Sequence, residues 1–483
     1  MKTNTLDFDA QALREKILDL AMRGKLVPQD PNDEPASVLL EKIKAEKEQL
    51  IKEKKIKKSK PLAPITDDEK LFDIPDSWEW VRLGDVGLLK NGKTPKKEDI
   101  SSDNIYPYFK VKDMNNNNLY MENVKNWVGE KYSRQVMPKN TIIFPKNGGA
   151  ILTAKKRILS QDSLVDLNTG GLIPYNDLNH KFIFYLFLSL DIKDFVKGSA
   201  VPTINSKKLK ETLVPLPPLE EQSRIAAKIA QLFALLRKVE SSTQQYAKLL
   251  TLLKSKVLDL AMRGKLVEQD THDEPASVLL EKIKAEKAEI VKEKKIKKSK
   301  PLPPITDEEK PFDIPDSWEW VRLGDVYHFV DYRGKTPHKI SSGIRLITAK
   351  NVRNGYIKLE PEEFISLEEH KERSTRGLIN KGDIFITTEA PMGLVALNNF
   401  DEPIATAQRL ITLQKVSKYQ DSSFAAFQMQ SSFFQKELQQ KATGSTVKGI
   451  KASNLKQVLI LIPPLAEQRR TVKKISQVLK LLK

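Results

Sequence analysis

The chain has 483 residues, of which 40% are hydrophobic, and it carries a formal net charge of +18. This length allows about two to four domains, each with its own core. The absence of cysteine excludes disulfides, thiolate metal sites and a cysteine nucleophile. The five histidines show no ligand-like spacing, so we predict no metal site.

The positive charge favours a polyanionic partner, most often nucleic acid, over charge that only keeps a large protein soluble. The most apolar stretch, 182–190, is about half the length of a membrane helix, and the first ten residues contain no apolar segment. We therefore expect a cytoplasmic protein without a membrane partner.

The sequence contains a duplicated unit. Residues 13–86 align with 253–326 at an offset of 240, with 61 of 74 positions identical. A weaker pair, Leu-Pro-Pro-Leu-Glu-Glu-Gln at 216–222 and Ile-Pro-Pro-Leu-Ala-Glu-Gln at 462–468, has an offset of 246. The segments between these repeats, about 87–215 and 327–461, share little beyond Gly-Lys-Thr-Pro. Two different variable segments, which we call modules, therefore lie between nearly identical repeats, which we call the frame.

This arrangement predicts five parts in chain order. They are an N-terminal repeat (1–75), a first module (76–216), a central helical repeat (217–315), a second module (316–462) and a C-terminal helix (463–483).

The N-terminal repeat predicts a helix from about 34 to 58, with a copy at 274–298. Lysine runs at 52–60 and 292–300 end these helices. A lysine run is often only a solvated helix face, but two runs in symmetric positions favour contact with a polyanion or a partner protein. The choice between DNA and a partner subunit stays open.

The first module reads as mixed α/β. Alternating apolar and polar residues predict a strand at 77–83, another strand is expected at 140–144, and 182–190 predicts a helix. Residues 87–94 match the P-loop pattern, but Pro95 follows at once and the other copy has Phe329 in place of the first glycine. We expect a loop that presents Lys93 and Thr94 to a phosphate backbone and not a nucleotide site.

The central repeat predicts one long helix, from about 218 to 263, or roughly 69 Å at 1.5 Å per residue. Its apolar positions are spaced alternately four and three apart, with only Thr243 polar, which is the pattern of a coiled coil. The predicted seam consists of Ile225, Ile229, Leu232, Leu236, Val239, Tyr246, Leu250, Leu253, Val257 and Leu260.

The second module predicts a strand at 382–388 and a helix at 424–438. Neither module contains a Gly-x-Gly-x-x-Gly loop, a nucleophile elbow, a zinc-protease motif or a methyltransferase motif, so we predict no catalytic residue in this chain.

The two chain ends continue the same seam. By the repeat offsets Lys483 corresponds to Arg237 and Met1 to Ser241, so the ends would rebuild the central helix with three positions missing. We predict an α+β, pseudo-twofold protein with circularly permuted repeats. Two α/β modules would be separated by long antiparallel coiled-coil helices, and the termini would be adjacent.

Two variable modules, each preceded by Ile-Pro-Asp-Ser-Trp-Glu-Trp-Val-Arg-Leu-Gly and followed by a Pro-Pro-Leu-x-Glu-Gln helix, resemble the specificity subunit of type I restriction–modification enzymes. The resemblance covers essentially the whole chain. Residues 13–27 look like the branch of the family with an N-terminal copy of the central repeat.

The resemblance implies that the modules are target recognition domains, each reading one half of a bipartite double-stranded DNA site. The coiled coil would set the gap between the halves. Two modification (methyltransferase) subunits would dock on the frame, and restriction (motor–nuclease) subunits would join for cleavage. S-adenosylmethionine, ATP and Mg²⁺ would belong to those partners, and this chain would bind no cofactor.

Base readout requires polar or basic side chains on loops that reach a DNA groove. The candidates in the first module are Lys93, Thr94, Lys110, Lys112, Asn115, Asn116, Lys146, Asn147, Lys155 and Arg157. Those in the second module are Arg333, Lys335, Thr336, Arg345, Lys350, Asn351, Arg353, Thr387, Thr388 and Arg409.

Two other functions stay open at this point. One is the recognition subunit of a related enzyme that cuts on both sides of a bipartite site. The other is a coiled-coil scaffold that joins proteins and ignores DNA, against which the charge and the two unlike modules argue.

Overall fold

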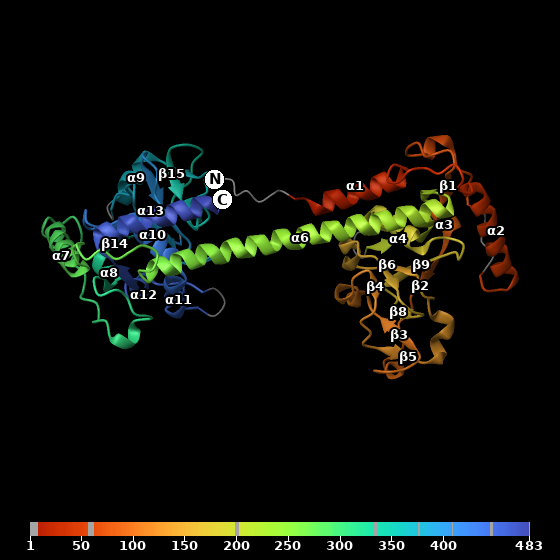
Figure 1. The fold of residues 1–483 in the computed structure, drawn as a ribbon, viewed down its shortest axis with the longest axis horizontal. Helices are drawn as coiled ribbons and strands as arrows, with labels where there is room; N and C mark the ends of the chain where they lie inside the picture. The colour runs from red at the N-terminus through yellow and green to blue at the C-terminus, as the bar shows by residue number, and fades with distance from the viewer. Residues whose placement is uncertain are drawn as a thin grey trace. The chain divides into compact units, whose positions relative to one another are not determined.

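The computed structural model describes residues 8–56, 62–198, 202–332, 336–374, 377–407, 409–444 and 448–482. The chain divides into two compact units, which we call the N-unit (Thr5–Thr243) and the C-unit (from Gln244 onward). Each unit contains one module, and the helix α6 (Leu219–Met262) contributes its first part to the N-unit and its last part to the C-unit (Figure 1).

Antiparallel helices form the frame of each unit. In the N-unit, α1 (Ala10–Met22) lies beside α6, and Arg14 pairs with Glu240 through an Nη1–Oε1 distance of 3.2 Å. Gln29, further along the chain, contacts Glu221 at the opposite end of this part of α6, so the two segments run in opposite directions. In the C-unit, α13 (Leu465–Leu481) is the counterpart, with Ile475 in the same core as Leu258 of α6.

In each unit a buried carboxylate in the first turn of one frame helix joins that helix to the repeat segment that precedes the module. Glu221, in the first turn of α6, accepts hydrogen bonds from the Trp78 indole (2.8 Å) and the Gln29 amide (2.6 Å). In the C-unit, Glu467 accepts from Trp318 (2.8 Å) and Gln269 (2.5 Å). We call each such set of three residues a clasp; burial raises the pKa of both carboxyl groups.

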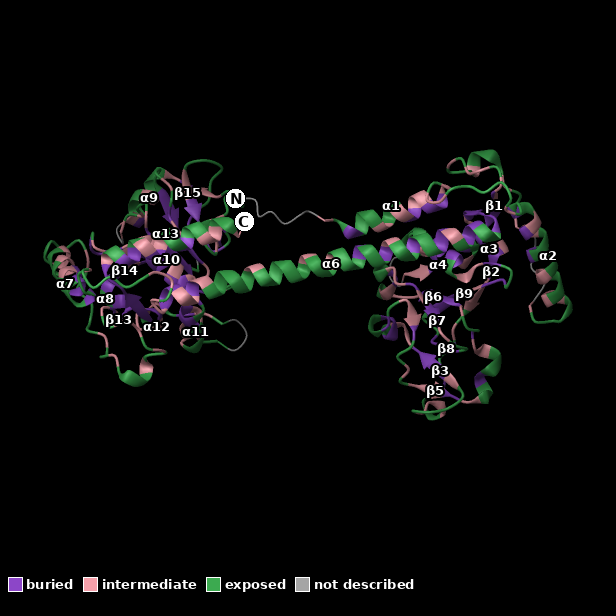
Figure 2. Ribbon diagram, viewed as in Figure 1, coloured by how far each residue is buried: buried purple, intermediate pink, exposed green. Residues whose placement is uncertain are grey.

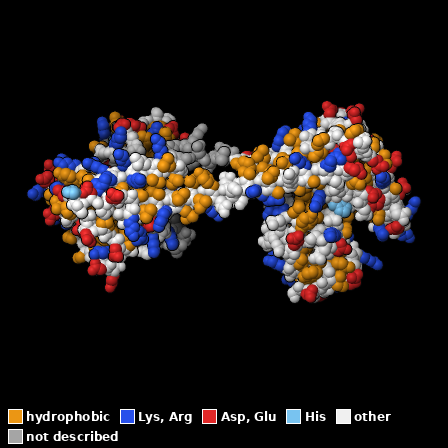
Figure 3. Space-filling view, viewed as in Figure 1, with side chains coloured by type: hydrophobic (Ala, Val, Ile, Leu, Met, Phe, Trp, Pro, Cys, Tyr) orange, Lys and Arg blue, Asp and Glu red, His pale blue; other side chains and the backbone are white. Residues whose placement is uncertain are grey.

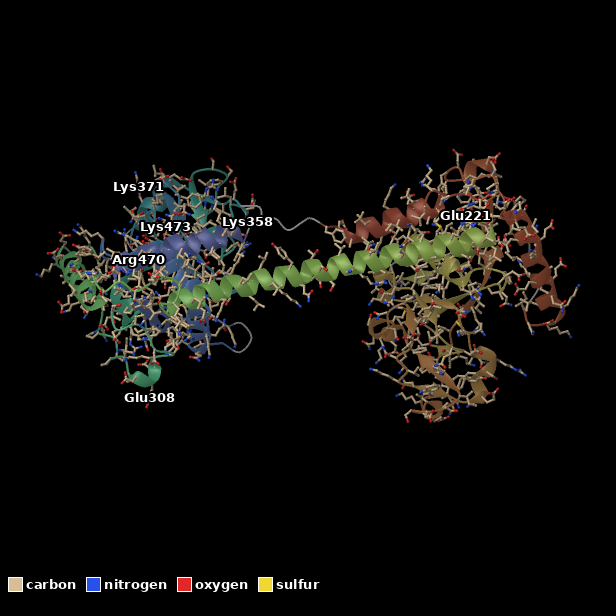
Figure 4. All side chains as sticks on the ribbon, in the orientation of Figure 1. Glu221, Glu308, Lys358, Lys371, Arg470 and Lys473 are labelled. Atoms are coloured by element: carbon tan, nitrogen blue, oxygen red, sulfur yellow. The ribbon has the colours of Figure 1, made fainter. Side chains whose placement is uncertain are left out.

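The neighbouring residues of the Pro-Pro-Leu-x-Glu-Gln motif extend each clasp. In the N-unit the Gln222 amide oxygen accepts from the backbone of Asn179, and Arg224 forms an ion pair with Asp33. In the C-unit, Arg470 and Asp273 form the matching ion pair at 2.6 Å. Figure 4 shows Glu221 at the start of α6 and Arg470 on α13.

Paired strands close each module where it meets the frame. In the N-unit, β1 (Glu79–Arg82) pairs antiparallel with β12 (Leu213–Leu216). In the C-unit, β13 (Glu319–Arg322) pairs in the same way with β23 (Leu459–Ile462). The first and last strands of a module are therefore neighbours, and the segment between them can vary without opening the frame.

The N-unit module contains two main sheets. A five-stranded sheet has the order β2-β9-β6-β7-β4, and a three-stranded sheet has the order β5-β3-β8. The bounds are β2 Gly87–Asn91, β3 Tyr106–Phe109, β4 Tyr120–Met121, β5 Trp127–Val128, β6 Ile142–Pro145, β7 Arg157–Leu159, β8 Leu164–Val165, β9 Thr169–Pro174, β10 Val196–Lys197 and β11 Thr203–Ile204. The helices besides α1 and α6 are α2 Ala36–Lys52, α3 Leu83–Val86, α4 His180–Ser189 and α5 Ser206–Glu211. The aromatic side of α4 and the apolar side of α6 share one core.

The C-unit module has a four-stranded sheet, β14-β22-β19-β20, and a three-stranded sheet, β18-β15-β21. The bounds are β14 Tyr327–Asp331, β15 Ile344–Ile347, β16 Val352–Arg353, β17 Tyr356–Ile357, β18 Phe364–Ile365, β19 Ile384–Thr387, β20 Val395–Leu397, β21 Ile404–Thr406 and β22 Leu410–Lys415. The helices besides α6 and α13 are α7 Ala276–Lys292, α8 Leu323–Val326, α9 Leu367–Arg373, α10 Ser422–Gln430, α11 Ser432–Gln440 and α12 Ala452–Leu455. The predicted α+β class, with two mixed modules and a long helix between them in the chain, is confirmed.

The basic helices are shorter than predicted. α2 and α7 end at Lys52 and Lys292, before the lysine runs are complete. Lys54 has φ 55° and Lys294 has φ 58°, and the amide of the next residue reaches back to the carbonyl of Leu50 or Ile290. This is the Schellman arrangement that stops a helix. Beyond α7 the C-unit run continues as turns and irregular chain, and its lysine side chains are exposed.

The helix predicted at 424–438 is two helices, because Ser431 takes an extended conformation (ψ 157°) between α10 and α11. The strand predictions at 77–83, 140–144 and 382–388 correspond to β1, β6 and β19.

The predicted seam is buried only toward the ends of α6. Ile225, Ile229 and Leu236 are buried, and Leu232, Leu250, Val257 and Leu260 are half-buried. Val239, Tyr246 and Leu253 are exposed. Figure 2 shows that most of the middle of α6 is exposed, and Figure 3 shows hydrophobic side chains along that stretch. Met1 and Lys483 lie outside the described residues, so the adjacency of the termini stays a prediction.

The clasp generates a prediction about stability. Trp78→Phe removes the indole N–H from Glu221 and should lower the free energy of unfolding by about 1–3 kcal/mol at pH 7, because a buried carboxylate loses a donor. Burial raises the pKa of Glu221 in the folded state above that of a glutamate in the unfolded chain. As the pH rises through this range, the carboxyl group ionises first in the unfolded chain, so the folded state becomes less stable. The loss should therefore shrink at acidic pH, where the carboxyl group is protonated.

Chemical denaturation followed by circular dichroism measures this effect. Trp80→Phe is the matched control, because the clasp of the N-unit uses Trp78 and not Trp80. An equal loss of stability in both variants at every pH would show that packing, and not the hydrogen bond to Glu221, stabilises this junction.

Candidate nucleic-acid interface

The strand registers relate the two modules residue by residue. β3 pairs parallel with β8 in the N-unit, with Phe109 opposite Val165, and β15 pairs parallel with β21 in the C-unit, with Ile347 opposite Thr406. The same turn follows each first strand. The Asp113 carboxylate accepts from the Lys110 amide (2.8 Å), and the Asn351 side-chain oxygen accepts from the Thr348 amide (3.1 Å). Residues 110–116 and 348–354 are therefore equivalent loops, which we call the strand-end loops.

The strand-end loop of the N-unit forms one wall of a surface cleft of about 540 Å³. Four predicted residues, Lys110, Lys112, Asn115 and Lys155, line this cleft, and Lys155 donates to the side-chain oxygen of Asn115. Asp166, also in the lining, has its pKa raised by burial and accepts from Thr169 Oγ1 (2.7 Å). Three lysines and one amide facing open space make a surface suited to an anionic, hydrogen-bonding partner.

The segment that matches the P-loop pattern is not a phosphate loop. Residues 87–91 form the strand β2, and the Lys93 amide donates to the carbonyl of Val165 at 2.8 Å. A side chain at Gly92 would start 2.0 Å from the Asp166 carbonyl, so glycine is required there for close backbone packing. The side chains of Lys93 and Thr94 are exposed beside the strand-end loop, and Thr94 Oγ1 accepts from the Leu167 amide.

Two other first-module candidates, Arg157 and Asn147, have hydrogen-bond partners within the module. Arg157 is half-buried, and its Nε and Nη1 donate to the carbonyls of Asn117 (2.9 Å) and Lys156 (2.8 Å), so part of its guanidinium group is engaged within the module. Asn147 donates to the Leu167 carbonyl (3.2 Å). Lys146 is half-buried, and Asn116 is exposed. The sequence did not distinguish these arrangements, because all four residues read as polar loop positions.

Lys156, between two candidates, was not predicted and has a structural function. Its ammonium group is buried and donates to the carbonyls of Leu188 (3.4 Å) and Leu190 (2.5 Å) at the end of α4. Burial lowers the pKa of Lys156 to about 8.

Three second-module candidates are buried and were wrongly assigned to a DNA-facing surface. Asn351 donates to the carbonyls of Lys358 (3.1 Å) and Pro361 (3.0 Å) while its oxygen holds the strand-end loop. The Thr387 hydroxyl donates to the Pro391 carbonyl at 2.7 Å, and Thr388 is 1% exposed. These residues shape the module from within.

The other second-module candidates lie at the surface or outside the described residues. Lys350 is exposed, and Arg353 is half-buried with Nη1 donating to the Val352 carbonyl at 2.7 Å. Arg345 pairs with Glu362 (3.0 Å), and Arg409 pairs with Glu389 (3.0 Å). Thr336 is exposed, whereas Arg333 and Lys335 lie outside the described residues.

Within the described part of the chain, no group of three or more histidine and acidic side chains is placed to hold a metal ion. No helix in that part has the length and apolar character needed to cross a membrane.

The contrast between two asparagines of the equivalent loops gives a prediction. Asn351→Ala should lower the free energy of unfolding by about 1–3 kcal/mol, because it leaves buried carbonyls and amides unpaired. Asn115→Ala, in the exposed cleft, should leave stability within about 0.5 kcal/mol and change only DNA binding. Thermal denaturation and DNA-binding titrations of the two variants separate these effects. An Asn351→Ala protein that keeps its stability but prefers a different DNA sequence would contradict this assignment and would place Asn351 among the residues that contact DNA.

Comparisons with known proteins agree with this architecture. The sequence model of the type I restriction modification DNA specificity domain matches residues 75–249 and 315–483, so the matches cover one module with most of α6 and the other module with α13. The EcoAI specificity subunit of Escherichia coli is 32% identical over 540 residues, covering 98% of this chain and 89% of that protein. The MjaVIII specificity subunit of Methanocaldococcus jannaschii is 25% identical and covers 84% of this chain and 87% of its own length.

A solved structure that describes complex assembly and conformational transition of the type I R-M system has a similar fold, with a TM-score of 0.57 at 19% identity. The structural alignment covers 85% of this chain and 92% of the chain in the solved structure. The family model matches more than half of the chain, and the Escherichia coli relative aligns over nearly all of it. The chain belongs to the family of type I restriction–modification DNA specificity subunits.

Proposed function

We propose that this chain recognises an asymmetric, bipartite double-stranded DNA site, with one module reading each half. The observation that supports this most strongly is the contrast between frame and modules. The two clasps are identical in residue type and nearly identical in geometry, whereas the loops that the modules present differ. Identical frames with unlike surfaces suit a protein that presents two different readers in the same way.

The strand-end loops are the best candidates for reading bases. Lys112 and Lys350 occupy equivalent positions, and a lysine at both suits a shared phosphate or guanine contact. Three positions further along, after two buried residues, the first module has Asn115 and the second has Arg353. Asparagine typically pairs with adenine and arginine with guanine, so this position suits a difference between half-sites.

The helix α6 suits the function of a spacer. Its 44 residues span about 66 Å at 1.5 Å per residue, which exceeds the roughly 34–36 Å of one DNA turn. A continuous helix transmits a fixed length and rotation better than a loop, so we propose that its length sets the gap between half-sites.

We also propose that the chain is non-catalytic and that S-adenosylmethionine, ATP and Mg²⁺ bind to partner subunits. Two modification subunits would dock on the frame, and restriction subunits would join them in the cytoplasm. Membership of the specificity family supports this assignment over a DNA-independent scaffold. The recognition subunit of an enzyme that cuts on both sides of its site remains the second candidate.

The basic run after α7 gives the test of DNA binding. Lys292, Lys294, Lys295, Lys297 and Lys298 are exposed. Changing all five to glutamine should weaken DNA binding without changing the preferred sequence. The slope of log affinity against log salt should fall by about 0.9 for each DNA phosphate that the variant no longer neutralises.

Changing the same lysines to arginine keeps the charge and is the matched control. Fluorescence anisotropy with duplex DNA at several salt concentrations measures the slope. Full DNA affinity with failed subunit assembly in the glutamine variant would make the run a protein contact, and salt-independent binding by the parent chain would contradict the DNA-binding function.

A further inference from the structure

A groove of about 690 Å³ in the N-unit has no function in the proposed DNA recognition. One face of α1 forms one side, including Leu18 and Met22, and the end of α4 and the strand β12 form the other. The aromatic pair Phe72 and Trp80 lies in its lining, with ring centroids 5.0 Å apart. All of these residues belong to the N-unit.

The C-unit contains the same aromatic pair, but there a third ring covers it. Phe312 and Trp320 correspond to Phe72 and Trp80 within an identical stretch of sequence. Phe433 of α11 packs edge-on against both, at centroid distances of 5.4 and 5.8 Å and interplanar angles of 87° and 85°. The C-unit therefore shows which chemical group this surface accepts.

The N-unit module does not supply that ring from its described residues. After α10 the C-unit chain continues into α11, which packs on β23. After α4 the N-unit chain instead forms a short 3-10 turn, η6 (Ile192–Phe195), and β12, the counterpart of β23, lines the open groove. Trp80 is accordingly only half-buried, whereas Trp320 is 9% exposed.

We propose that this groove is a docking site for a helix of a partner protein that presents an aromatic side chain, bound against Phe72 and Trp80 as Phe433 is bound in the C-unit. Edge-on ring contacts of this geometry favour an aromatic group over an aliphatic one. The mode is a helix in an apolar groove, anchored by one large side chain.

The charges around the groove suit such a partner. Arg14 is paired with Glu240, Asp19 with Arg23, and Lys156 with the carbonyls that end α4. The other charged lining residues, Glu15, Asp191 and Lys193, are exposed and can stay in contact with water, so a helix can cover the groove without burying an unpaired charge, which would oppose binding. Exposed Lys193 at the rim would favour an acidic residue beside the aromatic one. The docking site does not depend on DNA recognition.

The chain itself provides the probe. A fluorescent peptide of residues 431–441, which contains Phe433 and Glu437, should bind the full-length protein saturably in an anisotropy titration. Trp80→Ala, Ser189→Arg and a Phe433→Ala peptide should each weaken binding about tenfold or more, as expected for the loss of an aromatic anchor or for a charge placed in the groove.

Ser189 is exposed at the end of α4, so the Ser189→Arg protein should keep the melting temperature of the parent. It therefore tests the groove even if the Trp80→Ala protein does not fold. Ser241→Arg, exposed on α6 and not part of the groove lining, is the matched control and should bind normally. No saturable binding, or binding that is equal for the Phe433→Ala peptide or survives Ser189→Arg, would overturn the docking site. None of these outcomes alters the salt-dependence test of DNA binding.

Discussion

A buried glutamate at the start of a helix holds each half of this protein together. Glu221 and Glu467 each accept a tryptophan N–H and a glutamine amide from a segment about 140 to 200 residues away in sequence. A carboxylate removed from water is costly unless its hydrogen bonds are satisfied, so these three residues must fold together. The next residue of the motif, Gln222 or Gln468, reaches the start of a module helix, so the same turn fixes frame and module.

This constraint explains how unlike modules can share one frame. The strand pairs β1–β12 and β13–β23 bring the two ends of each module together, and the clasp lies directly beside them. Everything that varies lies between these strands. A change in the module loops, away from the core that α4 shares with α6, can therefore leave the frame in place. Such a division suits a subunit in which the recognised DNA sequence can change while the geometry of subunit assembly stays the same.

The repeat made the frame predictable, because residues that recur at a fixed offset must fold in the same way twice. The period of the seam likewise located α6, although Val239 and Tyr246 proved exposed. The candidate site was harder to predict. Asn115 and Asn351 both follow a strand in a polar loop, yet Asn351 is buried because the distant segment 358–361 folds over it. Phe433 covers one aromatic pair and nothing equivalent among the described residues covers the other, and no local pattern records that difference. Burial of single side chains depends on long-range packing, which spacing alone does not encode.

The central claim is that the clasped frame fixes geometry while each module fixes one half of the DNA site. Exchange of residues 87–212 for the same segment of a related specificity subunit, with both clasps kept, tests it most directly. The exchanged chain, assembled with its modification subunit, would be used to methylate DNA, and the methylated sites would be sequenced. The account predicts a new first half-site with the second half-site and the gap unchanged. A change in both halves, or in the gap, would contradict it.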